Sequence, residues 1–309
     1  MSQVKRHVLR RDLKRNGTLY LILLPVLAFY IIFHYIPMFG VVMAFERFNP
    51  TKGFLGSDWV GFKWFEQFFS SYYFSRLLKN TLVLSLKDIL IGFPAPIILA
   101  LLLNELRHER YKKTVQTLSY LPHFISWVTL SGLFIQLLSP STGPIAAITR
   151  AFGGEPYYFM GKVETFRWVL VVTNIWKGVG WGSIIYLAAL AGVDQEMYEA
   201  ALIDGASRFQ RVWYITLPSI FPTITIMLIL QSGSIISDNF DQVYNMMNDA
   251  VYRVANVLGV YTYDLGLKNL SNAGLAKSTA VGLFKNVIAL ILVLTTNAIS
   301  KKISDNGIW

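Results

Sequence analysis

The chain has 309 residues, of which 54% are hydrophobic and only 15% are charged, whereas a typical soluble domain has about 25% charged residues. Its mean hydropathy of +0.45 indicates a membrane protein and excludes a disordered or collagen-like chain. The sequence contains no cysteine, which excludes disulfides, thiolate metal sites and cysteine nucleophiles. Its 4 histidines show no metal-ligand spacing, so we expect no metal site.

Six segments are apolar over about the 20 residues that a membrane-spanning helix needs. We therefore predict an all-α membrane protein with a six-span domain at residues 19–299, a basic tail at 1–18 and a short tail at 300–309. The spans are expected near residues 19–45, 77–103, 117–138, 166–191, 218–237 and 279–299. The second and fourth spans are interrupted by charged residues, prolines and glycines. Such breaks are tolerated where neighbouring helices or water cover the backbone, which favours a bundle around a path.

Basic residues mark one side of this bundle. They are Lys5, Arg6, Arg10, Arg11, Lys14 and Arg15 before the first span, Arg107, Arg110, Lys112 and Lys113 after the second, and Lys301 and Lys302 after the last. The positive-inside rule therefore places both termini in the cytoplasm. The loops on the other side, near residues 46–76, 140–165 and 238–275, hold most of the aromatic residues outside the spans. They would form an interfacial aromatic belt, a dock for an extracytoplasmic partner, or both.

The cytoplasmic loop between the fourth and fifth spans, about residues 192–217, is polar but has the pattern of two short helices. Asp194 is suited to cap the first helix, and Gly205 allows a sharp bend after it. A second, amphipathic helix would follow, and Leu217-Pro218 would begin the fifth span, because proline is tolerated in a first helical turn. A rigid element held between two spans can dock on a cytoplasmic protein and pass its motion to both. The alternative is a re-entrant or surface-lying helix.

This loop resembles the EAA loop of binding-protein-dependent ABC importer permeases. The pattern is EAA, three residues, Gly, nine residues and I-x-LP, and it fits without gaps. In that family the loop docks in a cleft of the ATPase subunit, where the Glu makes polar contacts and the Gly forms the bend. The resemblance gives those two roles to Glu199 and Gly205. The other residues that it marks for ATPase coupling are Ala200, Ala201, Asp204, Arg208, Leu217 and Pro218.

Other segments resemble the LplB-like polysaccharide permeases, a carbohydrate-uptake subgroup related to the maltose permeases. They are YIPMFGVVMAFERFNP, WVGFKWFEQFF, LPHFISWV and STAVGLFKNVIALILVLTTNAISKK. The resemblance implies a type I ABC importer permease fold with six transmembrane helices in a bacterial plasma membrane. It also implies a second six-span permease, most often a paralogue, two ATPase subunits, and an extracytoplasmic solute-binding protein that delivers an oligosaccharide.

The chain lacks the G-x-x-x-x-G-K-[ST] pattern of a phosphate-binding loop. ATP and Mg would therefore be bound by the partner ATPase, with no cofactor in this chain. We expect a transport subunit rather than an enzyme.

Ionisable residues inside spans are costly and mark candidate functional positions. They are Lys87 and Asp88 in the second span, Lys177 in the fourth and Lys285 in the sixth. Three lysines against one aspartate would favour an anionic sugar, such as a uronate-containing oligosaccharide. Alternatively, Lys87 and Lys177 would form inter-helix pairs and backbone carbonyls would satisfy Lys285.

Polar and aromatic residues gather around Lys177, a mixture that suits sugar rings because aromatic faces stack on C–H groups while polar groups bind hydroxyls. They are Asn174, Trp176 and Trp181. Glycines at 178, 180 and 182 would permit close helix packing or act as a hinge. After the fifth span, Asp238, Asn239 and Asp241 resemble the start of the family's external loop, which can probe a binding protein.

Two other functions remain open at this point. A secondary transporter driven by an ion gradient would use a coupling residue, for which Asp88 is the candidate. A membrane scaffold or sensor would only recruit a cytoplasmic partner, and would not need charged residues inside its spans. Transport of labelled oligosaccharide with and without ATP separates the three.

Overall fold

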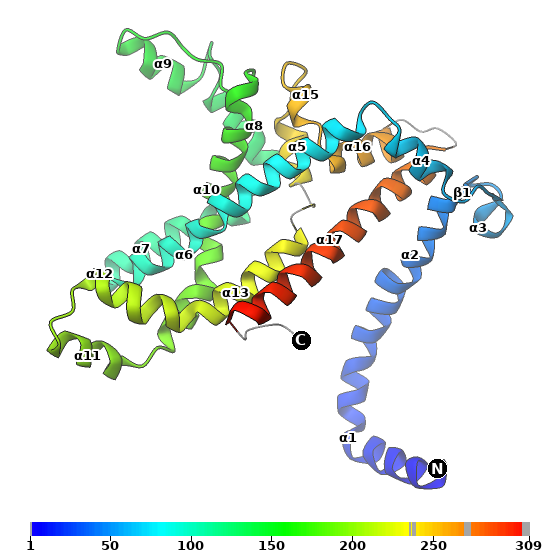
Figure 1. The fold of residues 1–309 in the computed structure, drawn as a ribbon, viewed down its shortest axis with the longest axis horizontal. Coiled ribbons are helices and arrows are strands. Elements are labelled where there is room, and N and C mark those ends of the chain that lie inside the picture. Colours follow the sequence, from blue (N-terminus) through cyan, green and yellow to red (C-terminus); the bar gives the residue numbers. More distant parts are fainter. Residues whose placement is uncertain (1, 235, 237–238, 269–272, 305–309) are drawn as a thin grey trace. The chain divides into compact units, whose positions relative to one another are not determined.

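The structure is a computed structural model that describes residues 2–234, 236, 239–268 and 273–304. Its described part is almost entirely helical (Figure 1). The chain divides into two compact units. Unit 1 comprises residues 1–69 and 265–283, and unit 2 comprises residues 70–264 and 284–309.

Unit 1 contains a long N-terminal helix followed by a small aromatic subdomain. Its elements are α1 (Ser2–Tyr30), η1 (Ile31–Tyr35), α2 (Ile36–Met38), η2 (Phe39–Phe45), β1 (Glu46–Arg47), α3 (Gly53–Gly56), β2 (Asp58–Trp59), α4 (Lys63–Phe69) and the first part of α17 (Gly274–Ser304). The strands pair antiparallel, with Glu46 opposite Trp59. Trp64 is buried and donates its indole N–H to the Glu46 carbonyl at 2.8 Å. This bond satisfies the polar edge of a ring that packs on Ala276 and Ala280.

Unit 2 is a helical bundle built around α10. Its elements are α5 (Phe74–Lys87), η3 (Asp88–Gly92), α6 (Pro94–Asn104), α7 (Glu109–Tyr120), η4 (Leu121–Phe124), α8 (Trp127–Leu137), α9 (Pro144–Ala151), α10 (Val163–Ala191), α11 (Gln195–Ile203), α12 (Arg208–Arg211), η5 (Val212–Thr216), α13 (Leu217–Ser234), α14 (Phe240–Met246), α15 (Tyr252–Ala255) and α16 (Leu258–Tyr263), and η7 (Asp264–Lys268) begins at its boundary. Helix α10 packs against α6, α7 and α13. The elements that carry the candidate sites therefore share one central helix.

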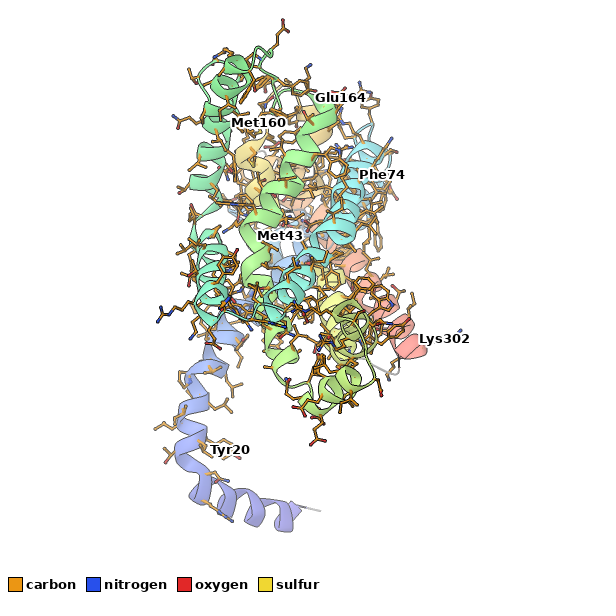
Figure 2. All side chains as sticks on the ribbon, turned by 90° about the vertical axis from the view of Figure 1, so that its left-hand side faces the viewer. Tyr20, Met43, Phe74, Met160, Glu164 and Lys302 are labelled. Carbon is orange, nitrogen blue, oxygen red and sulfur yellow. The ribbon has the colours of Figure 1, made fainter. Side chains whose placement is uncertain are left out.

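The two ends of unit 2 carry different elements. Helices α11 and α12 and the short connection from α6 to α7 lie at one end, and we name it the coupling end (Figure 1). The first turns of α5 and α10 lie at the other end, where Figure 2 labels Phe74, Met160 and Glu164. The basic loop after the second expected span and the predicted coupling loop thus lie at the same end.

The spans agree in part with the six expected. Four helices of the described chain are long and apolar enough to cross a membrane. They are Arg15–Phe45, Phe74–Asn104, Arg208–Ser234 and Gly274–Lys302. Helix α10 covers the fourth expected span with 29 residues, but it is not among those that qualify. Asn174 and Lys177 lower its hydropathy.

The third expected span is not one straight helix. The pair Glu109–Phe124 and Trp127–Leu137 is bent by 104° and counts as a fifth span only if the two parts are taken together. Pro122 lies in the first turn of η4, where it lacks an N–H for a continuing helix. The Ser126 Oγ accepts a hydrogen bond from the Thr129 N–H at 3.2 Å and starts α8 as a new helix.

The start of the fifth span agrees in part with the expectation. Helix α13 begins at Leu217, with Pro218 in its first turn, but it continues without a break from the helical run that starts at Arg208. A widened turn at η5 precedes Pro218, and the Leu217 N–H donates to the carbonyl of Val212, five residues back. This turn accommodates a proline that could not donate to the carbonyl four residues before it.

The glycines of α10 have different surroundings. A Cβ at Gly180 would lie 2.1 Å from the Ser119 carbonyl oxygen, and one at Gly182 would lie 3.0 Å from the Pro96 ring. A Cβ at Gly178 would meet nothing within 4 Å. Gly180 is therefore required for the close approach of α10 to α7, which favours packing over a hinge at this position.

We expect Gly180→Ala to destabilise the bundle, because the added methyl group meets backbone rather than a movable side chain. The free energy of unfolding should fall by about 1–3 kcal/mol, the usual cost of overpacking. Thermal unfolding of the purified protein in detergent measures the change. Gly178→Ala is the matched control, and it should be neutral or slightly stabilising, since alanine favours helix over glycine. Equal melting temperatures for the two variants would contradict this account.

Candidate functional site

The predicted coupling loop is a well-formed helix–bend–helix element. The Asp194 carboxylate accepts a hydrogen bond from the Glu196 N–H at 3.0 Å and caps α11. Gly205 follows with φ of +77°. The N–H groups of Gly205 and Ala206 donate to the carbonyls of Leu202 and Ala201, respectively, at 3.1 and 2.8 Å. This pair of bonds is the Schellman arrangement, which needs the left-handed conformation that glycine adopts readily.

Helix α12 begins with a capping box. The Ser207 Oγ accepts from the Gln210 N–H at 3.3 Å, and the Gln210 side chain accepts from the Ser207 N–H at 2.8 Å. Both bonds satisfy N–H groups that a helix start leaves without partners. The short second helix is therefore stabilised at its first residue, immediately after the bend.

Helix α11 contacts the residues at the start of α13. The Tyr198 hydroxyl is 2.9 Å from the buried Thr216 hydroxyl. The Tyr198 ring packs on a cluster of Leu190, Val193 and Ile220, which come from α10, the loop after it and α13. Helix α11 is thus attached to both α10 and α13 through these contacts.

The coupling element presents both charged and apolar groups on its surface. Glu199, Asp204 and Arg208 are exposed, as a docking role requires. The aromatic side chains of Phe209, Trp213 and Tyr214 are 75%, 57% and 74% exposed. They form a groove with Gln210. Grouped exposed aromatics mark an interaction surface for a protein partner or for the membrane interface. The amphipathic pattern of the second helix predicts Phe209 and Trp213 on one side of it, but it does not mark Tyr214.

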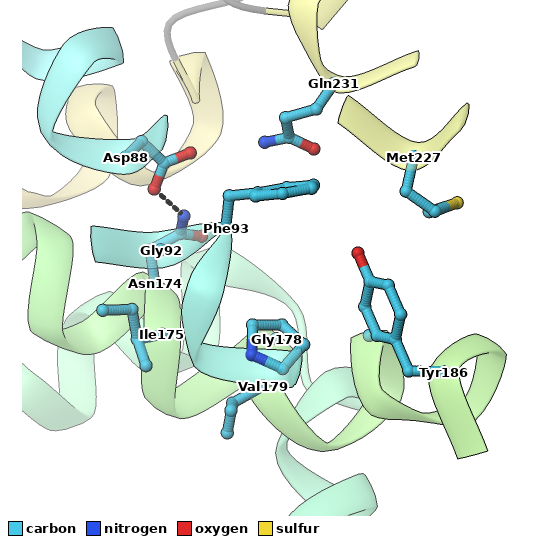
Figure 3. Close-up of a pocket in the computed structure, with 12 residues that line it drawn as sticks. Asp88, Gly92, Phe93, Asn174, Ile175, Gly178, Val179, Tyr186, Met227 and Gln231 are labelled. Carbon is cyan, nitrogen blue, oxygen red and sulfur yellow. Dashed lines mark hydrogen bonds between the residues drawn. The ribbon is translucent and has the colours of Figure 1, made fainter. Parts of the chain in front are cut away.

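A cavity of about 210 Å³ lies between α5–α6, α10 and α13 (Figure 3). It is lined by Asp88, Gly92, Phe93, Pro96, Asn174, Ile175, Gly178, Val179, Gly182, Tyr186, Met227 and Gln231. The Asp88 Oδ1 accepts a hydrogen bond from the Asn174 amide at 2.7 Å. Polar side chains and the aromatic rings of Phe93 and Tyr186 thus share one cavity, the combination that sugar rings require.

Asp88 and Asn174 are the expected path residues that the structure brings together. Tyr186 and Gln231 were not among the residues that the sequence predicts for the path. A usable signal existed on α10, because Asn174, Gly178, Gly182 and Tyr186 recur every four residues and such residues share one helix face. The contribution of α13 had no comparable signal, since Gln231 only begins the polar stretch of residues 231–234 after an apolar run.

Lys177 does not line the cavity and holds the bend between η4 and α8. Its ammonium group is 2.7 Å from the carbonyl oxygens of His123 and Ile125, and 3.4 Å from that of Pro122. Trp181 stacks on the His123 ring at 4.5 Å. The Pro122 carbonyl also accepts from the Ile125 N–H at 3.2 Å, whereas those of His123 and Ile125 lie at the break between the two helices. A cation is well suited to carbonyls at such a break. Lys177 and Trp181 thus stabilise the bent span.

The other expected path residues also lie outside the lining of this cavity. The Lys87 ammonium is 3.7 Å from the centroid of the Trp168 ring, a cation–π contact between α5 and α10. Trp176 packs edge-on against Phe134 at 5.5 Å. Lys285 lies in α17.

The residues expected to probe a binding protein lie around the start of α14. Asn239 has φ of +42°, and Asp241 lies in the first turn of the helix. Asp238 falls outside the described residues. The binding-protein contact stays a prediction.

Comparison with known proteins places these features in context. The profile of the family described as "Binding-protein-dependent transport system inner membrane component" matches residues 92–305. Two Bacillus subtilis (strain 168) proteins are similar over nearly their whole length. "Protein LplB" is 46% identical, over 96% of this chain and 92% of that protein. The "Polygalacturonan/rhamnogalacturonan transport system permease protein YteP" is 44% identical, over 99% of this chain and 94% of that protein.

The fold is also similar to a solved structure. A chain in the crystal structure of a bacterial ABC transporter involved in the import of the acidic polysaccharide alginate has a TM-score of 0.87. It is 41% identical in sequence, and the match covers 96% of this chain and 99% of that chain. The same transporter has been crystallised with an alginate pentasaccharide-bound periplasmic protein.

We expect Gly205→Val to weaken docking of the ATPase subunits that the resemblance implies. A left-handed conformation costs a residue with a Cβ about 1–2 kcal/mol, so the bend that joins α11 to α12 should be disfavoured by roughly 5–30-fold. Co-purification of the ATPase with the tagged chain from membranes measures the loss.

Gly192→Val is the control for this prediction. Gly192 is exposed at the end of α10 with φ of −90°, and a Cβ there meets the Ala189 carbonyl oxygen at an ordinary 3.5 Å. This variant should retain the ATPase. If Gly205→Val also retains it and transports normally, the docking role of the bend is wrong.

We expect Lys177→Met to reduce stability and to lower uptake of acidic and neutral sugars alike, because it leaves the carbonyls at the bend without their cation. A buried polar group without a partner costs about 1–3 kcal/mol. Lys87→Met is the matched control, since it removes a cation–π contact of only about 0.5–1 kcal/mol at an exposed site. Melting temperatures and uptake assays test both. A selective loss of acidic-sugar uptake in Lys177→Met would instead place this lysine in the path.

Proposed function

Because the chain belongs to the family of binding-protein-dependent transport system inner membrane components, we propose that it is the membrane-spanning subunit of an ATP-driven importer of uronate-containing oligosaccharides. The observation that carries the proposal is the coupling element. It combines an exposed α11–Gly205–α12 surface with a buried attachment to the helices that line the cavity.

The sugar class is supported by the proteins that this chain resembles. YteP is named for polygalacturonan and rhamnogalacturonan, and the solved transporter imports the acidic polysaccharide alginate. Galacturonan and alginate are both built from uronate residues. Identities above 40% extend over almost the full length of these chains, whereas an arabinooligosaccharide permease, AraP, is only 26% identical. These sequence identities favour an acidic oligosaccharide over a neutral one as the substrate.

The cavity suits the passage of sugar rings. In the described residues, Asp88 Oδ2 has no hydrogen-bond partner, so it is available to accept from a hydroxyl group, while Oδ1 is held by Asn174. Phe93 and Tyr186 offer aromatic surfaces, and the Gln231 amide can donate and accept (Figure 3). These groups are suited to hydroxyls, which all sugars share, and so would not bind a uronate carboxylate strongly.

Coupling would follow from the attachment of α11. Closure of two ATPase subunits would displace the docked α11–α12 element. The Tyr198–Thr216 contact would carry that displacement to α13 and α10, on which Met227 and Tyr186 line the cavity. Access to the cavity would then alternate between the two ends of unit 2.

The remaining parts of the proposal concern partners and placement. The chain would pair with a second, paralogous six-span permease and receive its sugar from an extracytoplasmic binding protein. The coupling end and both termini would face the cytoplasm, with the chain in a bacterial plasma membrane.

Reconstitution of the complete transporter in liposomes tests this function. We expect labelled tetragalacturonate to be taken up only with ATP and the loaded binding protein, and ionophores should have no effect. The carboxyl-reduced, neutral oligosaccharide should be taken up about tenfold more slowly, equivalent to about 1.4 kcal/mol. Uptake that proceeds without ATP and stops with ionophores would assign the chain to ion-driven transport. Equal uptake of the two sugars would remove the acidic specificity.

A further inference from the structure

A second pocket lies at the end of unit 2 opposite the coupling end, between the first turns of α5, α10 and α15. Its volume is about 390 Å³. It is lined by Tyr72, Ser75, Arg76, Lys79, Asn80, Arg167, Arg253 and Val254. We call it the basic pocket. Its residues come from three distant parts of the sequence, so no local sequence motif predicts this pocket.

The charge of the basic pocket is uncompensated. Four of its lining residues are cationic and none is acidic. In the part of the chain that the structure describes, none of these four cations forms an ion pair, and the pair of Lys113 with Glu109 lies in α7. Several cations held together without carboxylates repel one another, and an incoming anion would relieve that repulsion.

The pocket is also preorganised. Asn80 is buried, and its amide donates to the carbonyls of Arg253 and Asn256 at 3.0 and 2.9 Å. Its side-chain oxygen accepts from the Arg167 guanidinium at 2.7 Å. The Arg76 guanidinium lies 5.1 Å from the Tyr73 ring centroid. Two arginines are thus held in place by groups that leave their positive charge unneutralised.

Each of these arginines has an unused donor. The Nε atoms of Arg76 and Arg167 are buried and have no hydrogen-bond partner in the described structure. These Nε atoms are closed to a ligand, so they would not themselves bind an anion. The rest of each planar guanidinium fork matches a carboxylate with two parallel hydrogen bonds, and both arginines line the pocket.

The basic pocket lies along the same two helices as the cavity of Figure 3. Arg167 and Asn174 are seven residues apart on α10, hence on one face and about 10 Å apart along the axis. Asn80 and Asp88 are likewise about two turns apart. The bridges Asn80–Arg167 and Asp88–Asn174 therefore join the same pair of helices at two successive levels.

We propose that the basic pocket is a carboxylate-binding subsite at the mouth of the transport path, which holds a uronate residue of the oligosaccharide before the chain of sugar rings reaches the deeper cavity. This inference rests on the proposed function for the identity of the ligand. The deeper cavity has no lysine or arginine in its lining. An acidic sugar would therefore be captured by charge at the mouth and released onward, where only hydroxyl-binding groups remain. Phosphate headgroups of lipids share this anionic chemistry, and the test separates the two sources.

The absence of cysteine from this chain allows a direct test in the complete transporter in nanodiscs. Ser75→Cys places a single thiol in the basic pocket. Ser141→Cys places one at an exposed position, beside Arg150. Each is reacted with the anionic sulfonatoethyl and the cationic trimethylammonioethyl methanethiosulfonate, and the transporter without these substitutions provides the background. We expect the ratio of anionic to cationic rates to be about tenfold higher at Ser75→Cys. Equal ratios would overturn the proposal.

Protection of the Ser75→Cys thiol from modification by added sugar identifies the ligand of the basic pocket. Tetragalacturonate should slow the reaction of Ser75→Cys in nanodiscs of neutral lipid, whereas its carboxyl-reduced form should not. The added pair Lys79→Gln/Arg253→Gln should abolish both the rate ratio and the protection. Lys162→Gln, which removes a charge from the start of α10 outside the pocket, should preserve both. Equal protection by the neutral sugar, or protection by anionic lipid without any sugar, would overturn a uronate subsite.

These measurements are independent of transport. If tetragalacturonate protects the thiol but is not taken up with ATP, the subsite stands and the proposed function fails. If it is taken up with ATP but gives no protection, the proposed function stands and the subsite is wrong.

Discussion

The bend between η4 and α8 exposes backbone carbonyls inside a helical bundle, and the contact of Lys177 with those carbonyls is the interaction on which the rest of unit 2 depends. In an apolar environment such groups must find partners within the protein. The lysine comes from α10, so the bend and the central helix position each other. Gly180 brings α10 close to α7 a turn further on. This packing turns the face that carries Asn174 and Tyr186 toward α5–α6 and α13.

The same constraint explains why irregular backbone coincides with the candidate sites. Prolines follow both η3 and η5, and each widened turn is closed by an N–H that donates to a carbonyl five residues earlier. The first turn holds Asp88 at the cavity. The second joins the α11–α12 element to α13 without a break. Departures from regular helix thus occur where Asp88 is held at the cavity and where the α11–α12 element joins α13.

The sequence correctly predicted the helical class, the family, the capping of α11 by Asp194 and the bend at Gly205, because each depends on local pattern. It named Lys177 as a candidate for the path and left an inter-helix contact as the alternative, and the bonds of Lys177 to the His123 and Ile125 carbonyls favour the alternative. It did not find the basic pocket, because Arg76, Arg167 and Arg253 are far apart along the chain. It predicted a third span at about residues 117–138 but not the bend within it, because hydropathy is insensitive to a bend.

The exposed aromatic side chains of Phe209, Trp213 and Tyr214 have a consequence for the life of the chain before assembly. Outside a membrane, such a surface favours nonspecific association and attracts chaperones and proteases. A copy made in excess of its partners would present this surface to the surrounding water and be removed or aggregate. A partner that covers these rings would therefore protect the chain from aggregation and proteolysis as well as dock on it.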